Sequence, residues 1–253
     1  MMKKRKKGSR DEITGISKEK EFDPGTWQPK TEIGMKVKAG EITDLDTILD
    51  SGKRIMEPQI VDMLLKGLQV DFLEIGQSKG KFGGGKRTIW RTTQKKTKEG
   101  NKPKFTAMAI VGNKDGYIGI GMGKAKETMP AKEKAIRQAK LNIIKIKRGC
   151  GSWACNCREP HSLPFAVRGK NGSSDITIMP APKGTGLCAE SECRKMLAIA
   201  GVKDVYSQTK GQTVTRVNLT LACYKALQHT AQMKVKHDYI AKAGIVAGRK
   251  AAQ

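Results

Sequence analysis

The chain has 253 residues and a formal net charge of +25, from 49 Lys and Arg against 24 Asp and Glu. Such an excess favours a polyanionic partner, and a nucleic acid fits best because each neutralised phosphate releases counterions. No apolar run approaches the ~20 residues of a membrane-spanning helix, and the basic start lacks the apolar stretch of a signal peptide, so we expect a cytoplasmic protein with no membrane partner.

The first 26 residues are predicted to form a basic tail, which contains the run Lys3-Lys4-Arg5-Lys6-Lys7. Such a run is disordered when free and often serves as a nucleic-acid arm, although a merely solubilising tail would look the same. The segment from Trp27 to Ile42 is predicted to be extended. Two short helices follow: the first lies between Asp44 and Gly52, which can cap and stop it, and the second begins near Pro58.

A basic antiparallel sheet of three strands is predicted next, after a loop rich in glycine and lysine at 79–87. Its strands run over Thr88 to Thr97, Lys104 to Gly112 and Tyr117 to Met122, with turns at 98–101 and 113–116. The stretch from Val70 to Ile75 is a candidate lead-in strand.

A long helix is predicted from Thr128, which can cap it, to Gly149. Its apolar stripe would consist of Ala131, Ala135, Ala139, Ile143 and Ile146. A second face would carry four basic residues, Lys134, Arg137, Lys145 and Arg148. The order helix, three-stranded antiparallel sheet, helix resembles the double-stranded-RNA-binding domain, which recognises the shape of RNA rather than its sequence.

The C-terminal half is predicted to be a compact ββαβα pair of layers, so the fold class is α+β. The first two strands span His161 to Val167 and Ser174 to Met179, with a turn at 169–172. A helix from Leu187 to Ala200, a strand from Val202 to Thr209 and a helix from Thr213 to Thr230 complete it. We expect five parts: a tail at 1–26, an RNA-binding domain at 27–149, a Cys-rich linker at 150–161, the α+β domain at 162–230, and a basic tail at 231–253 that a partner would order.

Basic residues gather at the turns of the predicted sheet and on the helix after it. A hairpin tip with this charge density can enter an RNA groove and hold phosphates without reading bases, whereas a solvated charged face is the alternative. The predicted RNA-binding residues of this region are Lys86, Arg91, Lys95, Lys96, Lys98, Lys102, Lys104, Lys134, Arg137, Lys145 and Arg148.

Three thiols and one imidazole occur within twelve residues, at Cys150, Cys155, Cys157 and His161. This donor set matches a tetrahedral structural Zn²⁺ site. The alternative is a group of reduced cysteines beside an ordinary histidine, because the spacing is not the usual pair of Cys-x-x-Cys motifs. The other cysteines, Cys188, Cys193 and Cys223, stand among apolar residues and are predicted to be small core residues.

The segment Pro180 to Gly186 is a glycine-rich loop that is predicted to open a helix. Free backbone amides at such a place bind anions, so the loop could hold a nucleotide or an rRNA phosphate, the latter with the help of Lys183, or it could simply turn the chain. No accompanying set of carboxylates for magnesium is recognisable, which disfavours the nucleotide and any small-molecule substrate.

Several stretches, taken in this order, resemble the universal fifth small-subunit ribosomal protein family in its archaeal and eukaryotic branch. They are Trp27-Gln28-Pro29-Lys30-Thr31 with Gly34, 109–121, 140–144, Arg148-Gly149, Pro160-His161, Gly172-Ser173, 180–186 and 200–205. The resemblance covers about 27–230, and the Cys-rich stretch is similar to that of archaeal members. The insert at 79–87 is longer than the family pattern, which leaves the start of the first strand open.

The resemblance implies a structural constituent of the small ribosomal subunit without catalytic activity. It implies an N-terminal domain like the double-stranded-RNA-binding fold and a C-terminal domain of the type named after this family. It also implies binding of small-subunit rRNA, contacts with neighbouring small-subunit proteins, a place near the mRNA entry channel, and a role in subunit assembly and translational accuracy.

Two other classes of function are the alternatives. A zinc- or nucleotide-dependent RNA-modifying enzyme would show turnover and a saturable small-molecule site. A free regulator that binds double-stranded RNA would not sediment with small subunits at high salt.

Overall fold

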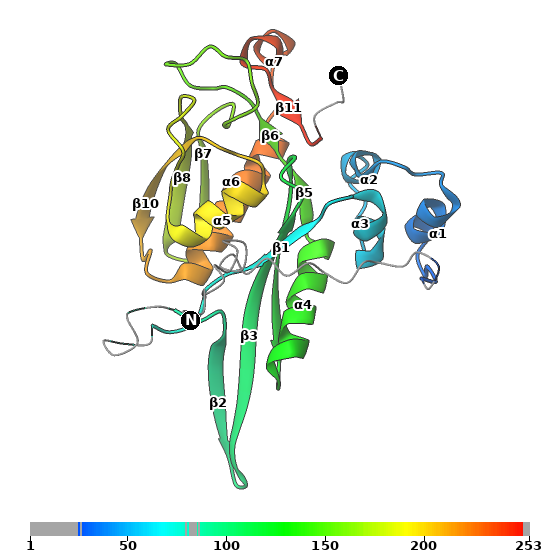
Figure 1. The fold of residues 1–253 in the computed structure, drawn as a ribbon, viewed down its shortest axis with the longest axis vertical. Helices are drawn as coiled ribbons and strands as arrows, with labels where there is room; N and C mark the ends of the chain where they lie inside the picture. Colours follow the sequence, from blue (N-terminus) through cyan, green and yellow to red (C-terminus); the bar gives the residue numbers. More distant parts are fainter. Residues whose placement is uncertain (1–24, 26, 79, 81–84, 86, 250–253) are drawn as a thin grey trace, which may run out of the picture.

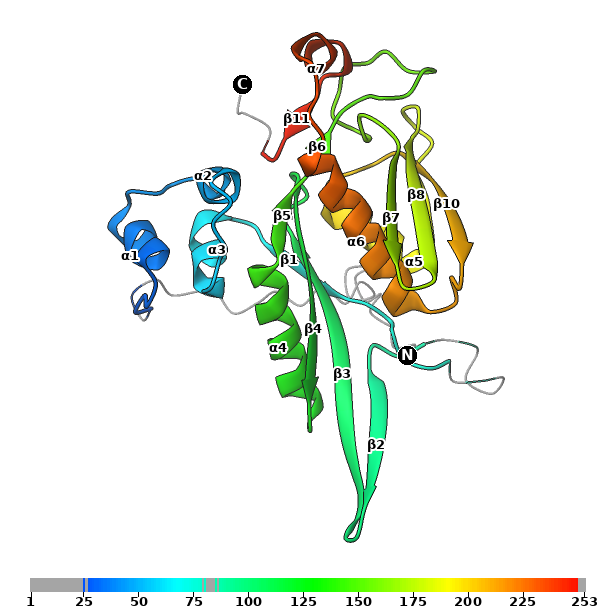
Figure 2. The same ribbon diagram turned by 180° about the vertical axis from the view of Figure 1, so that it is seen from behind.

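The computed structural model describes Gly25, 27–78, Gly80, Gly85 and 87–249. The predicted N-terminal arm, most of the glycine-rich loop and the last four residues lie outside this part of the chain. Two sheets, each covered by helices, stand side by side, and a long hairpin projects away from both (Figures 1 and 2). The predicted α+β class is confirmed, because the strands of these sheets pair mainly antiparallel.

Three short helices open the described chain: α1 (Glu32–Ala39), α2 (Leu45–Asp50) and α3 (Pro58–Leu64). The prediction that Trp27 to Ile42 is extended is wrong, because α1 occupies its middle. The Thr31 hydroxyl accepts a hydrogen bond from Gly34 N at 3.1 Å, and Gly40 ends the helix in the left-handed region. The two helices predicted after Asp44 and at Pro58 are confirmed.

The first sheet contains β1 (Gln69–Phe72), β2 (Arg91–Thr97), β3 (Gly100–Gly112), β4 (Tyr117–Ala125) and β5 (Ile143–Lys145). Its order is β1-β3-β4-β5, β2 pairs with β3, and all pairings are antiparallel. The three predicted strands are present, and β1 and β5 raise the number of strands within the described residues to five. The candidate lead-in strand is β1.

The helix α4 (Thr128–Leu141) covers one face of this sheet (Figure 1). The prediction that it continues to Gly149 is wrong. Ile143 to Lys145 instead pair with Tyr117 to Gly119 as β5, because bonds to the edge of β4 replace further helical turns. Lys145 and Arg148 therefore do not share a helix face with Lys134 and Arg137.

The contact between α4 and β4 depends on small residues on both sides. A Cβ added at Gly119, Gly121 or Gly123 would lie 2.2 Å from backbone atoms of α4. The facing residues of the helix are Ala131, Ala135 and Ala139, all fully buried. The helix axis thus lies as close to the strand as the two backbones allow, which fixes the position of α4 along the sheet.

The second layer pair contains β7 (Val167–Asn171), β8 (Ser174–Pro180), β9 (Leu187–Cys188), α5 (Ser191–Ile199), β10 (Val205–Gly211) and α6 (Arg216–Gln232). The sheet order is β7-β8-β10-β9. The first predicted strand was placed too early: β7 begins at Val167, because the chain turns at Gly172-Ser173, where Gly172 has a φ of +59°. The last strand and helix lie two to three residues later than predicted.

The segment after Pro180 also differs from the prediction. The strand β9 follows the glycine-rich loop and pairs in parallel with β10, so the helix α5 begins at Ser191 and not at Leu187. Cys193 and Cys223 are buried core residues as predicted, but Cys188 lies on this edge strand and is exposed.

The face of the first sheet opposite α4 packs against the second layer pair. Met108, Ile110 and Ile118 of the sheet belong to the same buried cluster as Leu197 of α5 and Leu219 of α6. The two layer pairs therefore share this apolar cluster, while a second cluster lies between α4 and the first sheet.

The predicted C-terminal tail from residue 231 contains regular secondary structure in its described part. It forms α7 (His237–Ala243) and β11 (Val246–Ala247), which pairs with β6 (Lys147–Arg148). The Gly248 carbonyl accepts a hydrogen bond from Arg148 Nη2 at 3.1 Å.

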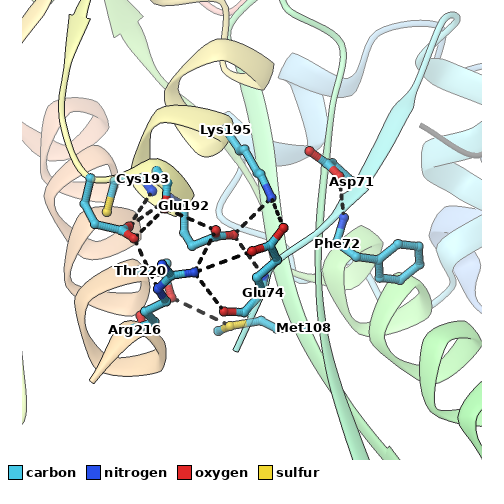
Figure 3. Close-up of polar contacts among 11 residues, drawn as sticks. Asp71, Phe72, Glu74, Met108, Glu192, Cys193, Lys195, Arg216 and Thr220 are labelled. Atoms are coloured by element: carbon cyan, nitrogen blue, oxygen red, sulfur yellow. Dashed lines mark hydrogen bonds and ion pairs between the residues drawn. The ribbon is translucent and has the colours of Figure 1, made fainter. Parts of the chain in front are cut away.

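Figure 3 shows a polar network that spans the junction of the two layer pairs. Glu192, at the start of α5, is 1% exposed. Its carboxylate accepts a hydrogen bond from Glu74 N at 3.0 Å, just after β1, and lies 3.2 Å from Arg216 Nη1 and 3.4 Å from Lys195 Nζ. Arg216 also donates to the Glu74 carbonyl at 3.2 Å, so one buried carboxylate and one arginine connect three elements.

We expect Gly121→Ala to destabilise the fold by about 2–3 kcal/mol, because the added methyl group forces α4 away from β4. At this chain length that corresponds to a fall of roughly 4–12 °C in the midpoint of thermal unfolding. Met122→Ala is the matched control, since Met122 is the next residue of β4 and is 53% exposed. Equal midpoints for the two variants would contradict this account of the contact.

Glu192→Gln removes the charge that compensates Arg216 and Lys195, and we expect a loss of about 2–3 kcal/mol in the free energy of unfolding, measured by denaturant titration. The estimate is below that for a wholly buried pair because both cations are partly exposed. Glu99→Gln, which removes an exposed ion pair with Lys102, should change the same quantity by less than about 1 kcal/mol.

Candidate nucleic-acid interface and metal centre

The hairpin of β2 and β3 extends beyond every other element (Figures 1 and 2). The side chains of β2 up to Lys96 and of the first five residues of β3 are exposed on both faces of the ribbon. Lys95 stands opposite Lys102, and Lys104 stands opposite Thr93. Like charges at directly opposed positions destabilise a strand pair, so the isolated hairpin tip is electrostatically unfavourable.

Neutralising groups are scarce at this tip. Lys102 has an exposed ion pair with Glu99 at 3.9 Å. Within the part of the chain that the structure describes, no carboxylate pairs with Lys95, Lys96, Lys98 or Lys104. The tip therefore has a concentrated positive charge with room around it for a polyanion, and an extended ribbon of this kind can enter a nucleic-acid groove.

The other predicted RNA-binding residues are divided between surface and interior. Arg91 of β2 and Lys134 and Arg137 of α4 are exposed. Lys183 is exposed and forms an ion pair with Glu159 at 2.8 Å. Lys86 lies outside the described residues.

Two of the predicted residues are held by the fold. Lys145 lies 2.7 Å from Asp50, and its side chain is largely covered. Arg148 is 5% exposed, and its Nη2 lies 2.6 Å from Asp115 Oδ1. The two residues lie in short strands and not on a common helical face, and their charges are already partly compensated.

The four predicted metal ligands come together. One ligand atom from each of Cys150, Cys155, Cys157 and His161 lies within 4.8 Å of all the others. A tetrahedral Zn²⁺ ion with bonds of about 2.3 Å to sulfur separates its ligand atoms by about 3.8 Å, so modest side-chain movement closes this set around an ion. Cys150 and His161 are buried and the other two are half-buried.

Asp204 orients the histidine of this cluster. Its Oδ2 lies 2.8 Å from His161 Nδ1, and both side chains are buried. The other ring nitrogen, Nε2, then faces the thiols and lies 3.9 Å from Cys155 Sγ. A carboxylate that holds the far nitrogen of a histidine is the usual outer partner of a histidine–metal bond. The sequence offered no signal for Asp204, which lies 43 residues after His161.

The thiols differ in their acidity. The backbone N–H of Lys183 lowers the pKa of the Cys155 thiol to about 6, with further help from Cys157. Burial raises the pKa of the Cys150 thiol to about 11. One thiolate is therefore already favoured near neutral pH, whereas a cation would be needed to hold the buried thiol in its charged form.

The glycine-rich loop at 180–186 does not lead directly into a helix but is hydrogen-bonded to Asp204, which contacts His161 of this cluster. Asp204 Oδ1 accepts hydrogen bonds from Gly184 N at 3.1 Å and from Gly186 N at 2.8 Å. These two amides are consequently occupied, and the loop leads into β9, so the predicted anion site at a helix start is not formed. Asp204 thus connects the loop to His161.

No helix in the described ranges has the length and hydrophobicity that crossing a bilayer would require.

Comparisons with known proteins give matches across both layer pairs. Residues 89–147 match the family model of the ribosomal protein S5 N-terminal domain, and residues 169–243 match that of the ribosomal protein S5 C-terminal domain. The small ribosomal subunit protein uS5 of Nanoarchaeum equitans is 46% identical over 222 residues, which cover 88% of this chain and 95% of that protein. The uS5 protein of Methanocaldococcus jannaschii is 45% identical over 90% of this chain and 98% of its own length.

Proposed function

The chain belongs to the ribosomal protein S5 family, and on that premise we propose that it is a non-catalytic structural component of the small subunit of cytoplasmic ribosomes and binds rRNA through the tip of the β2–β3 hairpin. The observation that carries the RNA-binding assignment is the exposed cluster of lysines at that tip, where Lys95, Lys96 and Lys98 have no carboxylate partner among the described residues. Exposed lysines on a narrow ribbon position a protein on RNA by holding phosphates, with little dependence on sequence.

The body of the protein supports a second set of contacts. Lys134 and Arg137 are exposed on α4, on the same side of the first sheet as the helix itself. We infer that they and Arg91 hold further phosphates, so that the hairpin and α4 grip rRNA from two sides. Lys183 would add a contact beside the Cys-rich segment.

We also propose contacts with neighbouring small-subunit proteins, a position beside the mRNA entry channel, and a part in subunit assembly and decoding accuracy. The family membership supports these assignments. An RNA-modifying enzyme is less favoured, because four protein ligands would complete a tetrahedral metal ion and leave no open position for a substrate. The family membership also disfavours a free RNA-binding regulator.

We propose that Cys150, Cys155, Cys157 and His161 hold one structural Zn²⁺ ion. The donor set, the 4.8 Å cluster and the Asp204–His161 hydrogen bond support it. When bound, the ion supplies a cross-link between distant parts of the segment 150–161. The Cys150 thiol donates a hydrogen bond to the Cys155 carbonyl at 3.3 Å, which coordination of the thiolate would replace.

The substitution of Lys95, Lys96 and Lys98 by Ala should weaken binding to small-subunit rRNA and flatten its dependence on salt. Each lost phosphate contact lowers the slope of log affinity against log salt by roughly 0.7 to 0.9, so we expect a decrease of about 2. The measurement is a filter-binding titration at several salt concentrations.

The matched control for that experiment changes the same three lysines to Arg, which keeps the charge and should keep the slope. An unchanged slope in the Ala variant would show that the hairpin tip does not touch RNA.

Elemental analysis of the purified chain should find about one Zn²⁺ per molecule. Cys157→Ser should lose most of the metal and unfold at a lower temperature, whereas Cys188→Ser, at an exposed thiol outside the cluster, should retain both. Substoichiometric metal in the unaltered chain, or equal metal loss in the two variants, would exclude the site.

A further inference from the structure

The three tryptophans of the chain are used in different ways. Trp27 is buried, and its indole Nε1 donates to Glu57 Oε2 at 2.9 Å. Trp90 is partly buried, with Lys132 Nζ 4.9 Å from its ring centroid. Trp153, in contrast, is 100% exposed and has no hydrogen bond or ring contact to any residue that the structure describes. The contacts within the described fold therefore do not explain why a large apolar ring stands at this position.

Trp153 stands at the tip of a turn that is fixed at both ends. Cys155 N donates to the Ser152 carbonyl at 3.3 Å, which closes the turn, and Cys150 Sγ donates to the Cys155 carbonyl at 3.3 Å. Gly151 N donates to the Leu163 carbonyl, and a Cβ at Gly151 would lie 2.1 Å from Pro164 O. The turn is thus seated against the body of the protein, and the indole is presented to solvent on a rigid support.

A fully exposed tryptophan is unfavourable in water. Burial of its side chain would be favourable, so a fixed turn that displays it suggests a partner that covers the ring. The residues beside it in the turn, Ser152, Ala154 and Asn156, are small or polar. They do not form the contiguous apolar surface that surrounds an anchor residue in a protein–protein interface.

The surroundings of this turn are cationic and aromatic. The helix α7 packs against the segment, because Cys150 N donates to the Ala243 carbonyl at 2.8 Å and Tyr239 Oη donates to the Pro164 carbonyl at 2.8 Å. Lys236 is the N-cap residue of this helix and Lys242 lies in its last turn; both are exposed, and Asp238 is the one carboxylate in the helix.

The segment itself adds to this positive charge. Arg158 is exposed, and the charge of Glu159 is neutralised by Lys183 at 2.8 Å. The area therefore has the mixture of basic and aromatic side chains that suits RNA, whereas an acidic protein surface would leave the indole without a stacking partner.

We propose that Trp153 is a stacking platform for an unpaired base of RNA, with the exposed cations Arg158, Lys236 and Lys242 available to the flanking phosphates. Every base has a face that stacks on an aromatic ring, and RNA exposes unpaired bases in loops and bulges. The inference rests on the proposed function, since it supposes that the chain lies against rRNA. It adds a contact to a base at the Cys-rich segment, far along the sequence from the phosphate-binding hairpin.

The direct test is ultraviolet cross-linking of small subunits that contain the chain, followed by trypsin and mass spectrometry. Cleavage after Arg148 and Arg158 isolates Trp153 in the peptide 149–158. We expect this peptide to have a nucleotide adduct that is absent from Trp153→Ala subunits. A cross-link to a neighbouring protein, or a peptide 149–158 without any adduct, would overturn the proposal.

A binding assay separates stacking from charge. With protein-free small-subunit rRNA as the probe, Trp153→Ala should weaken affinity by roughly 5- to 100-fold at constant salt slope, because no phosphate contact is lost. Trp153→Phe should retain most of the affinity. Tyr206→Ala, at an exposed aromatic residue of β10, is the control and should leave the affinity unchanged.

The outcomes for this inference and for the proposed function are distinct. If Trp153→Ala leaves the affinity for rRNA unchanged while the hairpin lysine substitutions still reduce its salt dependence, the stacking proposal alone is wrong. Absence of the unaltered chain from small subunits, together with no affinity for rRNA, would sink the proposed function as well.

Discussion

The close contact of β4 with α4 is the constraint on which the rest of the structure depends. Gly119, Gly121 and Gly123 leave no room for a side chain, so the helix backbone rests on the strand itself. With α4 fixed there, the opposite face of the sheet must be covered by another layer, and α5 and α6 cover it. The register of β3 is set by β4, and its extension past the sheet forms the hairpin that we assign to RNA. The position of the binding element thus follows from a stripe of glycines in the core.

Single carboxylates organise the regions where the chain is least regular. Asp204 accepts hydrogen bonds from the glycine-rich loop through one oxygen and faces His161 with the other. Glu192, at the start of α5, accepts a hydrogen bond from Glu74 N after β1 and pairs with Arg216 of α6, so it links these three elements. Both are buried, so their partners cannot be replaced by water without a cost in desolvation. In a chain with a large positive excess, the few acids that are buried are structural cross-links.

Sequence patterns predicted the elements that local chemistry determines. The turn at 113–116, the helix at Pro58 and the cluster of thiols followed from residue types and their spacing. The predictions failed where a distant segment determines the local structure. Ile143 to Lys145 continue a helical stripe in the sequence but pair with β4. Leu187 pairs with β10 before the helix α5 begins. Arg148 looked like a surface cation because Asp115 and Gly248, which bury it, are 33 and 100 residues away. No local rule connects His161 with Asp204.

The opposed lysines of the hairpin also affect how susceptible the RNA-free protein is to proteolysis. Lys95 faces Lys102 across the ribbon, and the tip has no core to hold it together. A copy without a nucleic-acid partner therefore exposes a lysine-rich hairpin tip, and exposed tips are preferred sites of proteolytic cleavage. Under the proposed function, phosphates between those side chains would cover the same tip. The hairpin that we propose to bind RNA would then also shorten the lifetime of chains that are not bound to RNA.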